Sequence, residues 1–346
     1  MKKILVTGGC GYIGAHTIID LIENGFEVIS VDDLSRGSMR MIKGVEQITG
    51  RSVKNYKVNL CDMDDTEALF IENPGIVGII HFAAFKSVPE SVQEPLKYFR
   101  NNINSLVNVL QCAQEHHINQ FVFSSSCSVY GNPKELPVLE SAPLQEPESP
   151  YARTKQMGEA ICRDFAKQNR KFNVSLLRYF NPVGAHPSAL IGELQEKPEN
   201  LVPMITQTAI GKRGEMQVFG SDYPTRDGSC VRDYVHVMDI ANAHTKALQF
   251  TIEGKNEHKC EVFNLGTGNG VTVLELIDAF EKASGQKLSY KIGPRRPGDV
   301  VAVYANNNRA HDLLGWAPKY DLHQMMDTAW RWELTMKKEA EKIQLN

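Results

Sequence analysis

The sequence predicts an α/β protein, with a doubly wound parallel sheet of the Rossmann type and a smaller mixed α/β substrate-binding domain. Over the first half of the 346-residue chain, short apolar runs alternate with amphipathic stretches. A glycine-rich turn follows the first apolar run, and polar side chains follow several of the others. Beyond about residue 181 the alternation loosens, and Pro, Gly and polar residues cluster as they do in loops around a pocket.

The first predicted strand–helix–strand unit has the pattern of a dinucleotide site. Its strand, helix and second strand are predicted at residues 3–6, 15–24 and 27–31. Between the first strand and the helix lies Gly8-x-x-Gly11-x-x-Gly14, which lets the main chain approach a pyrophosphate at the helix N-terminus. The second strand ends in Asp32-Asp33, at the spacing where a carboxylate binds a ribose 2′-hydroxyl. An acid there repels the 2′-phosphate of NADP, so the pattern predicts NAD.

The alternation then continues along the chain. Further strands are predicted at 53–58, 75–82 and 120–125, and helices at 62–73 and 95–116. The continuous apolar run at 75–82 suits a parallel sheet covered on both faces. In open α/β sheets, ligands bind beyond the carboxyl ends of the strands. Asp32, Ala83 and Ser126 all fall at such ends, as does the glycine loop, so we expect them to line one site.

A possible acid–base group follows the last of these strands. Tyr151 and Lys155 are four residues apart and would share one helix face. A lysine ammonium beside a phenol favours the phenolate and would lower the tyrosine pKa from about 10. Tyr151 is therefore a candidate general base, with Ser126 hydrogen-bonding the same substrate oxygen. Such pairs also occur by chance on helices, and it is the surrounding dinucleotide pattern that makes this one a site.

Composition excludes several classes of function. The formal net charge of -3 gives no basic footprint for nucleic acid. The longest nearly apolar run, 75–85, is too short to span a membrane, and the N-terminus has no signal-peptide pattern. Seven scattered cysteines without a C-x-x-C pair predict reduced, buried thiols and neither a disulfide frame nor a metal site. We therefore expect a cytoplasmic protein without a nucleic-acid or membrane partner.

Several longer motifs make the sequence similar to a known family. They are VTGGCGYIG at 6–14, HFAAFK at 81–86, FSSS at 123–126, VYGNP at 129–133, LRYFNP at 177–182, VRDYVHV at 231–237 and RRPGD at 295–299. With them the chain resembles the extended short-chain dehydrogenase/reductase superfamily and, more narrowly, the UDP-glucose 4-epimerase family. The glycine loop and Tyr-x-x-x-Lys are shared widely, whereas the 177–182 and 231–237 motifs are much narrower.

The resemblance implies a mechanism that serves galactose metabolism by interconverting UDP-galactose and UDP-glucose. Tyr151, aided by Ser126, removes the proton of the sugar 4-hydroxyl while the C4 hydride passes to NAD. The resulting 4-ketose turns about its diphosphate linkage and takes the hydride back on its other face. Lys155 binds the nicotinamide ribose, and the uridine diphosphate anchors the molecule so that remote binding energy serves the reacting centre.

Binding residues carry over by position within the motifs. On the cofactor side they are Gly8, Gly11, Tyr12, Ile13, Gly14, Asp32, Asp33, Asn59, Leu60, Phe82, Ala83, Lys86, Asn101, Ser126, Tyr151, Lys155 and Tyr179. On the substrate side they are Asn181, Asn200, Leu201, Gln217, Val218, Phe219, Arg232, Arg296, Asp299 and Val303. The resemblance implies that the two arginines clamp phosphate oxygens, a task that suits the guanidinium fork.

A few positions depart from the family pattern or bear on its specificity. Asn59 stands where Asp is usual, Ala84 where Gly is usual, and Cys127-Ser128 replaces the common Ala-Thr. Val303 stands where the family residue borders the sugar C2 substituent. A large Tyr there is associated with excluding N-acetyl sugars, so the small Val predicts that UDP-GlcNAc and UDP-GalNAc are accepted too.

Other functions remain open on this scaffold. A nucleotide-sugar 4,6-dehydratase usually carries Asp-Glu where this chain has Cys127-Ser128. A UDP-uronic acid decarboxylase is also possible, and a non-catalytic NAD-dependent sensor would have lost the Tyr or the Lys.

The resemblance also implies a homodimer, built from helices near 95–116 and 151–168. Leu106, Val109 and Leu110 lie on the first of these helices, beyond one apolar stripe. We expect an NAD-binding Rossmann domain at 1–181, with returning segments near 237–266, and a UDP-sugar-binding domain at 182–346.

Overall fold

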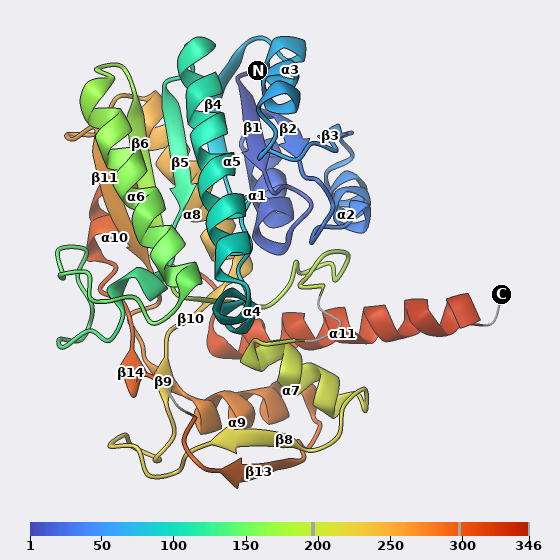
Figure 1. Ribbon diagram of the computed structural model, residues 1–346. Helices are drawn as coiled ribbons and strands as arrows, with labels where there is room; N and C mark the ends of the chain where they lie inside the picture. The colour runs from blue at the N-terminus through green and yellow to red at the C-terminus, as the bar shows by residue number, and fades with distance from the viewer. Residues whose placement is uncertain (195–197, 297–298, 345–346) are drawn as a thin grey trace.

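A seven-stranded sheet is the largest element of the structure, a computed structural model that describes residues 1–194, 198–296 and 299–344 (Figure 1). Its strands are β1 (Lys3–Thr7), β2 (Glu27–Val31), β3 (Asn55–Tyr56), β4 (Ile76–His81), β5 (Gln120–Ser124), β6 (Asn173–Tyr179) and β11 (Cys260–Leu265). Their order is β11-β6-β5-β4-β1-β2-β3, and neighbouring strands pair in parallel. The predicted doubly wound parallel sheet is confirmed.

Helices cover both faces of this sheet. One face carries α3 (Met63–Glu72), α5 (Pro95–Glu115) and α6 (Pro150–Gln168), and the other carries α1 (Tyr12–Glu23), α2 (Met39–Thr49), α8 (Val237–Ile252) and α10 (Asn308–Leu314). Along β1, Leu5 joins the core under the first set of helices, while Ile4 and Val6 join the other core. This explains the continuous apolar strands, because both sides of each strand are buried.

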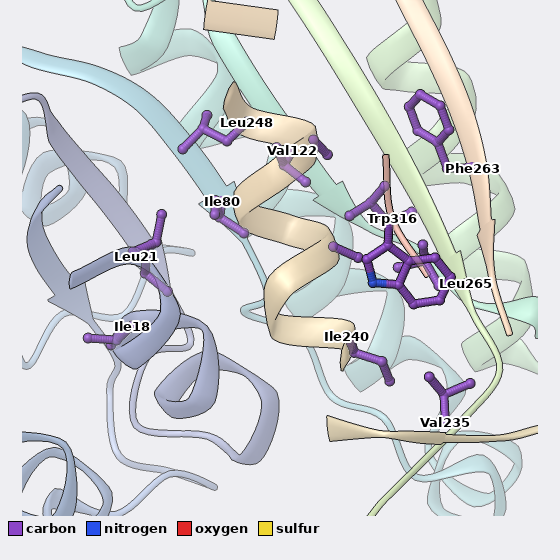
Figure 2. Close-up of a cluster of buried hydrophobic side chains, with 14 of the residues drawn as sticks. Ile18, Leu21, Ile80, Val122, Val235, Ile240, Leu248, Phe263, Leu265 and Trp316 are labelled. Atoms are coloured by element: carbon purple, nitrogen blue, oxygen red, sulfur yellow. The ribbon is translucent and has the colours of Figure 1, made fainter. Parts of the chain in front are cut away.

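Helix α8 lies at the centre of the second core. Figure 2 shows Ile240 and Leu248 of this helix among Ile80 of β4, Val122 of β5 and Trp316. Strand β11 follows α8 and pairs with β6. The chain therefore returns to the large sheet after it has left it at β6.

Most of the remaining elements form a smaller, mixed region below the carboxyl ends of the strands (Figure 1). They are β7 (Asn181–Val183), α7 (Leu201–Ala209), β8 (Met216–Phe219), β9 (Val231–Arg232), β10 (Tyr234–His236), β12 (Val271–Thr272), α9 (Val273–Ser284), β13 (Tyr290–Gly293), β14 (Ala302–Val303) and α11 (Leu322–Gln344). Two other short helices, α4 (Val88–Gln93) and η1 (Cys127–Tyr130), pack against α6 instead. Strand pairs β8–β13 and β7–β10 are parallel, and β9 pairs with both β12 and β14. A separate core with Val218, Phe280 and Met326 holds this region together.

Most predicted elements form, and three details differ. Strand β2 matches its prediction, whereas the strand predicted at 53–58 pairs over Asn55–Tyr56 alone. At this sheet edge the Val58 N–H bonds to the Tyr56 carbonyl oxygen and turns the chain away. Helices α2 and α4 were not predicted, although Ser38 and Ser87 cap their N-termini with hydroxyl oxygens.

The apolar residues offered for a dimer are not on the surface. Leu106, Val109 and Leu110 of α5 are buried in the core between that helix and the sheet, so the argument built on them is wrong. The exposed apolar residues of these helices include Val107 of α5 and Met157 of α6. Among the described residues, no helix has both the length and the apolar character needed to cross a membrane.

Candidate active site

The glycine loop between β1 and α1 is packed closely against the backbone around it. Gly8 has a φ of +68°, and a Cβ added to it would lie 2.9 Å from the Ala83 nitrogen. A Cβ at Gly14 would lie 2.2 Å from the Gly8 carbonyl oxygen. In the described part of the chain, no side chain caps α1 at its N-cap Gly11. The first-turn N–H groups, beginning at Tyr12 and Ile13, are therefore placed as a pyrophosphate requires.

Asp32 ties this loop to the end of β2. Its carboxylate accepts the N–H of Cys10 at 3.1 Å and that of Leu34 at 2.9 Å. A Cβ at Gly37 would lie 2.7 Å from the same carboxylate, so the chain passes close over it. Asp33 accepts hydrogen bonds from the Ser35 N–H and hydroxyl. Burial raises the pKa of Asp32, yet the N–H bonds oppose the shift, and the residues present fit an NAD ribose.

The end of β4 approaches the glycine loop from the other side. The Ala83 N–H donates to the Thr7 hydroxyl at 3.1 Å, and the Phe82 ring packs 4.6 Å from that of His244. The Lys86 ammonium lies 2.8 Å from a Glu193 carboxylate oxygen. These predicted cofactor residues therefore lie along one edge of the sheet.

A second group of predicted cofactor residues gathers around Cys61. The Asn59 side-chain oxygen accepts the Cys61 N–H at 3.0 Å, and the Cys61 thiol lies 3.5 Å from the Asn101 carbonyl oxygen. Leu60 is buried in the core, so a ligand could meet only its main chain. Asn59, which stands where the family usually has Asp, thus keeps a side-chain oxygen that can accept a hydrogen bond. That oxygen already accepts the Cys61 N–H within its own loop.

The predicted reaction centre assembles between β5, β6 and α6. Ser126, Tyr151 and Lys155 are all buried. The Lys155 ammonium donates to the Ser124 carbonyl oxygen at 2.7 Å and lies 5.9 Å from the centre of the Tyr151 ring. The Ser124 and Tyr179 hydroxyls are 2.8 Å apart. The end of β5, helix α6 and strand β6 therefore bring four predicted site residues together, namely Ser126, Tyr151, Lys155 and Tyr179.

The expectation that the pKa of Tyr151 is lowered is wrong. Burial raises the pKa of Tyr151 well above its ordinary value, because the phenolate would lose its hydration, and the Ser126 hydroxyl opposes this only in part. Burial also lowers the pKa of Lys155 to about 8. The ammonium is directed at a main-chain carbonyl rather than at the phenol, so it does not offset the desolvation.

Two predicted substrate arginines converge on the carboxylate of a third predicted residue, Asp299. Arg296 Nη2 lies 2.6 Å from Asp299 Oδ1, and Arg232 Nη2 lies 3.8 Å from the same oxygen. The Arg296 guanidinium also stands 5.5 Å from the Phe219 ring centre. Pro297 and Gly298 of the RRPGD motif lie outside the described residues. Val303 lies opposite Arg232 in the β14–β9 pair, so it borders this group.

The other predicted substrate residues are more scattered. The Asn200 side chain donates to Glu193 at 3.0 Å where α7 begins with Leu201, and Asn181 begins β7. On β8, Gln217 is half-buried, whereas Val218 is buried in the separate core. The Val218 side chain therefore cannot face a uracil, and any contact must use its main chain.

Two residues that no sequence pattern singled out contact predicted site residues or their neighbours. The Glu193 carboxylate accepts hydrogen bonds from the side chains of Lys86 and Asn200. A single acidic residue in a loop gives no sequence signal for such contacts. Asn102 accepts the Phe85 N–H at 2.8 Å and donates to the Thr154 hydroxyl at 3.0 Å. Its signal was a polar residue on the buried face of an amphipathic helix.

The cysteines take no part in this chemistry. Four are buried as predicted, but the prediction is wrong for three half-buried ones, Cys61, Cys127 and Cys260. Burial raises the pKa of Cys127, next to Ser126, to about 12. Its thiol is therefore neither an acid nor a nucleophile near neutral pH.

Fold and site together define an α/β enzyme that binds a dinucleotide and carries a buried Ser–Tyr–Lys group. A family model described as GDP-mannose 4,6 dehydratase matches residues 5–329. The UDP-glucose 4-epimerase of Bacillus subtilis is 44% identical over 331 residues, which are 95% of this chain and 96% of that protein.

Solved structures agree with this match. The UDP-glucose-4-epimerase of Stenotrophomonas maltophila, with bound NAD and formylated UDP-arabinopyranose, superimposes with a TM-score of 0.94 at 42% identity, covering 98% of this chain and 100% of that one. The UDP-Glc/GlcNAc 4-epimerase of Campylobacter jejuni gives 0.84 at 37% identity, covering 97% and 100%. The chain belongs to the UDP-glucose 4-epimerase family, and the enzyme class expected from the sequence is confirmed.

Proposed function

We propose that this enzyme interconverts UDP-galactose and UDP-glucose by reversible hydride transfer at sugar C4, through a 4-keto sugar and with NAD as a bound catalyst. The observation that carries the proposal is the convergence of Ser126, Tyr151 and Lys155 at the carboxyl edge of the sheet that also carries the glycine loop. The relatives described above support it, because they share the activity at high coverage.

Each reactive side chain has a task in this proposal. Tyr151 takes the proton of the 4-hydroxyl and later returns it, while Ser126 hydrogen-bonds the same oxygen. Lys155 sits between the Ser124 carbonyl and the Tyr151 ring, where it can bind the nicotinamide ribose. Bound NAD supplies the hydride acceptor and a positive charge that favours the phenolate. That charge would oppose the burial that raises the pKa of Tyr151.

The other half of the enzyme holds the nucleotide while the sugar turns. Arg232 and Arg296 meet the diphosphate and Asp299 a ribose hydroxyl, which requires their present contacts with each other to rearrange. We assign residues 1–181, with returning segments near 237–266, to the NAD-binding domain and 182–346 to the UDP-sugar-binding domain, although α10 of the latter range packs on the large sheet.

Dehydration is disfavoured, although the matching family model is named for a dehydratase. That chemistry needs an acid and a base beside the catalytic Ser or Thr. Cys127 and Ser128 occupy those positions, and the pKa of Cys127 is raised to about 12. A non-catalytic sensor is also disfavoured, because Ser126, Tyr151 and Lys155 are all retained.

The small Val303 supports a wider substrate range that includes UDP-GlcNAc and UDP-GalNAc. The Val303 side chain is buried in the core on the α8 face of the large sheet, and in the β14–β9 pair it stands opposite Arg232, one of the predicted substrate residues. The Campylobacter jejuni relative is named for both UDP-Glc and GlcNAc.

We further propose a cytoplasmic homodimer in which α5 and α6 pair with their symmetry mates. Val107 and Met157, exposed by 42% and 39%, supply apolar surface on these two helices. A measured mass in solution equal to one chain would contradict the dimer.

The function is tested by turnover of the purified enzyme on UDP-galactose, first without and then with added NAD. UDP-glucose formation without net NADH would establish epimerisation, and turnover without added NAD would show a retained cofactor. UDP-GlcNAc in the same assay tests the wider range. A protein that binds NAD and converts none of these sugars would contradict the proposal.

A further inference from the structure

A buried carboxylate joins the three elements that carry the reactive side chains. Glu159 of α6 accepts hydrogen bonds from the Ser125 hydroxyl at 2.6 Å and from Arg178 Nε and Nη2 at 2.8 and 2.6 Å. Glu159 and Arg178 are each 1% exposed. Ser125 directly follows β5 and Arg178 lies on β6. One side chain therefore ties both strand ends to helix α6.

The members of this group are neighbours of the site residues. In the chain, Ser125 and Arg178 immediately precede Ser126 and Tyr179, and Glu159 lies one helical turn beyond Lys155. Arg178 continues the network, since its Nη1 donates to the Tyr130 hydroxyl at 2.9 Å. Displacing any member would shift a reactive side chain with it.

Stability alone gives little reason for such a pair. Burying two charges costs desolvation energy that their attraction only offsets, and apolar replacements of such pairs are often neutral or stabilising. What the pair does supply is geometry, because a bidentate guanidinium–carboxylate contact fixes both distance and orientation. The third bond, from Ser125, extends that geometry to the residue next to Ser126.

We propose that Ser125, Glu159 and Arg178 form a positioning group for epimerisation, which holds the ends of β5 and β6 against α6 so that Ser126 and Tyr151 meet the same substrate oxygen. This inference rests on the proposed function. A misplacement of about 1 Å can cost about 100-fold in rate. The nucleotide anchors lie in the other half of the enzyme, so losing the group should lower kcat and leave KM nearly unchanged.

The test compares Ser125→Ala, Glu159→Gln and Arg178→Lys in the full-length enzyme. We expect kcat to fall about 10-fold in Ser125→Ala and about 100-fold in the other two, with KM for UDP-galactose within about twofold of wild type. Arg178→Lys keeps the charge but loses the fork, so it separates geometry from charge.

Glu261→Gln is the matched control. Glu261 is 2% exposed and pairs with Arg309, but it lies near the amino end of β11, away from the carboxyl ends that carry the site. We expect a lower Tm with kcat within about twofold of wild type, since only stability is affected.

Ser125→Ala decides the matter if the charge variants do not fold, because it leaves the ion pair in place. Wild-type kcat in this variant, or an equal loss of kcat in Glu261→Gln, would overturn the inference while the proposed function stands. Wild-type kcat in a folded Arg178→Lys would overturn it as well. Absence of turnover in the wild-type enzyme would instead overturn the proposed function, and this inference with it.

Discussion

The two halves of the site are built in different ways. Around the predicted reaction centre, Tyr151 and Lys155 of α6 are buried, and the Lys155 ammonium donates to the Ser124 carbonyl oxygen at the end of β5. Around the nucleotide position, the Arg296 side chain is 58% exposed and its partner Asp299 is itself a predicted ligand. We therefore expect the reaction centre to be pre-organised, and nucleotide binding to exchange internal contacts for substrate contacts. Substitutions in the first half should change kcat, and those in the second half KM.

The largest effect is expected for Tyr151→Phe. Without the hydroxyl no side chain can take the 4-hydroxyl proton, and kcat for UDP-galactose should fall about 1000-fold, because positioned acid–base groups contribute about 100- to 10,000-fold. KM should stay nearly constant. Tyr56→Phe, which removes a surface hydroxyl bonded to Glu72, is the control and should keep wild-type kcat. More than about a tenth of wild-type kcat in Tyr151→Phe would exclude Tyr151 as the general base.

Val303→Tyr tests the shape of the substrate half. The tyrosine ring should fill the space beside the sugar C2 position. The ratio of UDP-GlcNAc to UDP-galactose turnover should therefore fall by about 10- to 100-fold. Comparing two substrates on one variant cancels any loss of stability from overpacking. Val303→Ala is the matched control and should keep the ratio, because it adds no atoms. Unchanged N-acetyl turnover in Val303→Tyr would remove the specificity argument.

The sheet was predictable because its signals are local. Apolar runs, the glycine spacing and Asp32 at a strand end are all visible along the chain, and they recur in the structure. The meeting of Ser126 and Tyr151 was predictable for the same reason, since the order of the elements that carry them dictates where they lie.

What could not be predicted depends on contacts between distant segments. The pKa of Tyr151 reflects burial by elements that the Tyr-x-x-x-Lys spacing does not describe. Glu193 and Asn102 act through partners roughly 50 to 100 residues away in the chain, as with Lys86 and Thr154. Leu110 was expected on a dimer surface for a similar reason. The periodicity of a helix does not tell which of its apolar residues the sheet will cover, and the large sheet covers Leu110.

Arg296→Ala probes the exchange of internal for substrate contacts. Losing one exposed cation at the diphosphate should raise KM for UDP-galactose about tenfold, with kcat nearly unchanged. The neighbouring Arg295 provides a close control, since it is also exposed but pairs with Asp222. Arg295→Ala should leave KM within about twofold of wild type. Equal effects of the two substitutions on KM would show that Arg296 acts only through its positive charge and not through a specific contact with the diphosphate.

The smallest effect is expected at the adenine end of the cofactor site, where Asn59→Asp tests how firmly the first half is fixed. The Asn59 side-chain oxygen already accepts the Cys61 N–H at 3.0 Å, and Asp keeps that bond with a charged acceptor. Its second oxygen becomes available to the adenine amino group, so NAD affinity should rise by about two- to threefold. The gain is small because the site is exposed and the new bond replaces one to water. Cofactor retention after dialysis measures it, with turnover of the fully loaded enzyme unchanged. Weaker retention would mean that the loop around Cys61 is arranged for a neutral side chain, and that the departure at Asn59 is part of how this chain holds NAD.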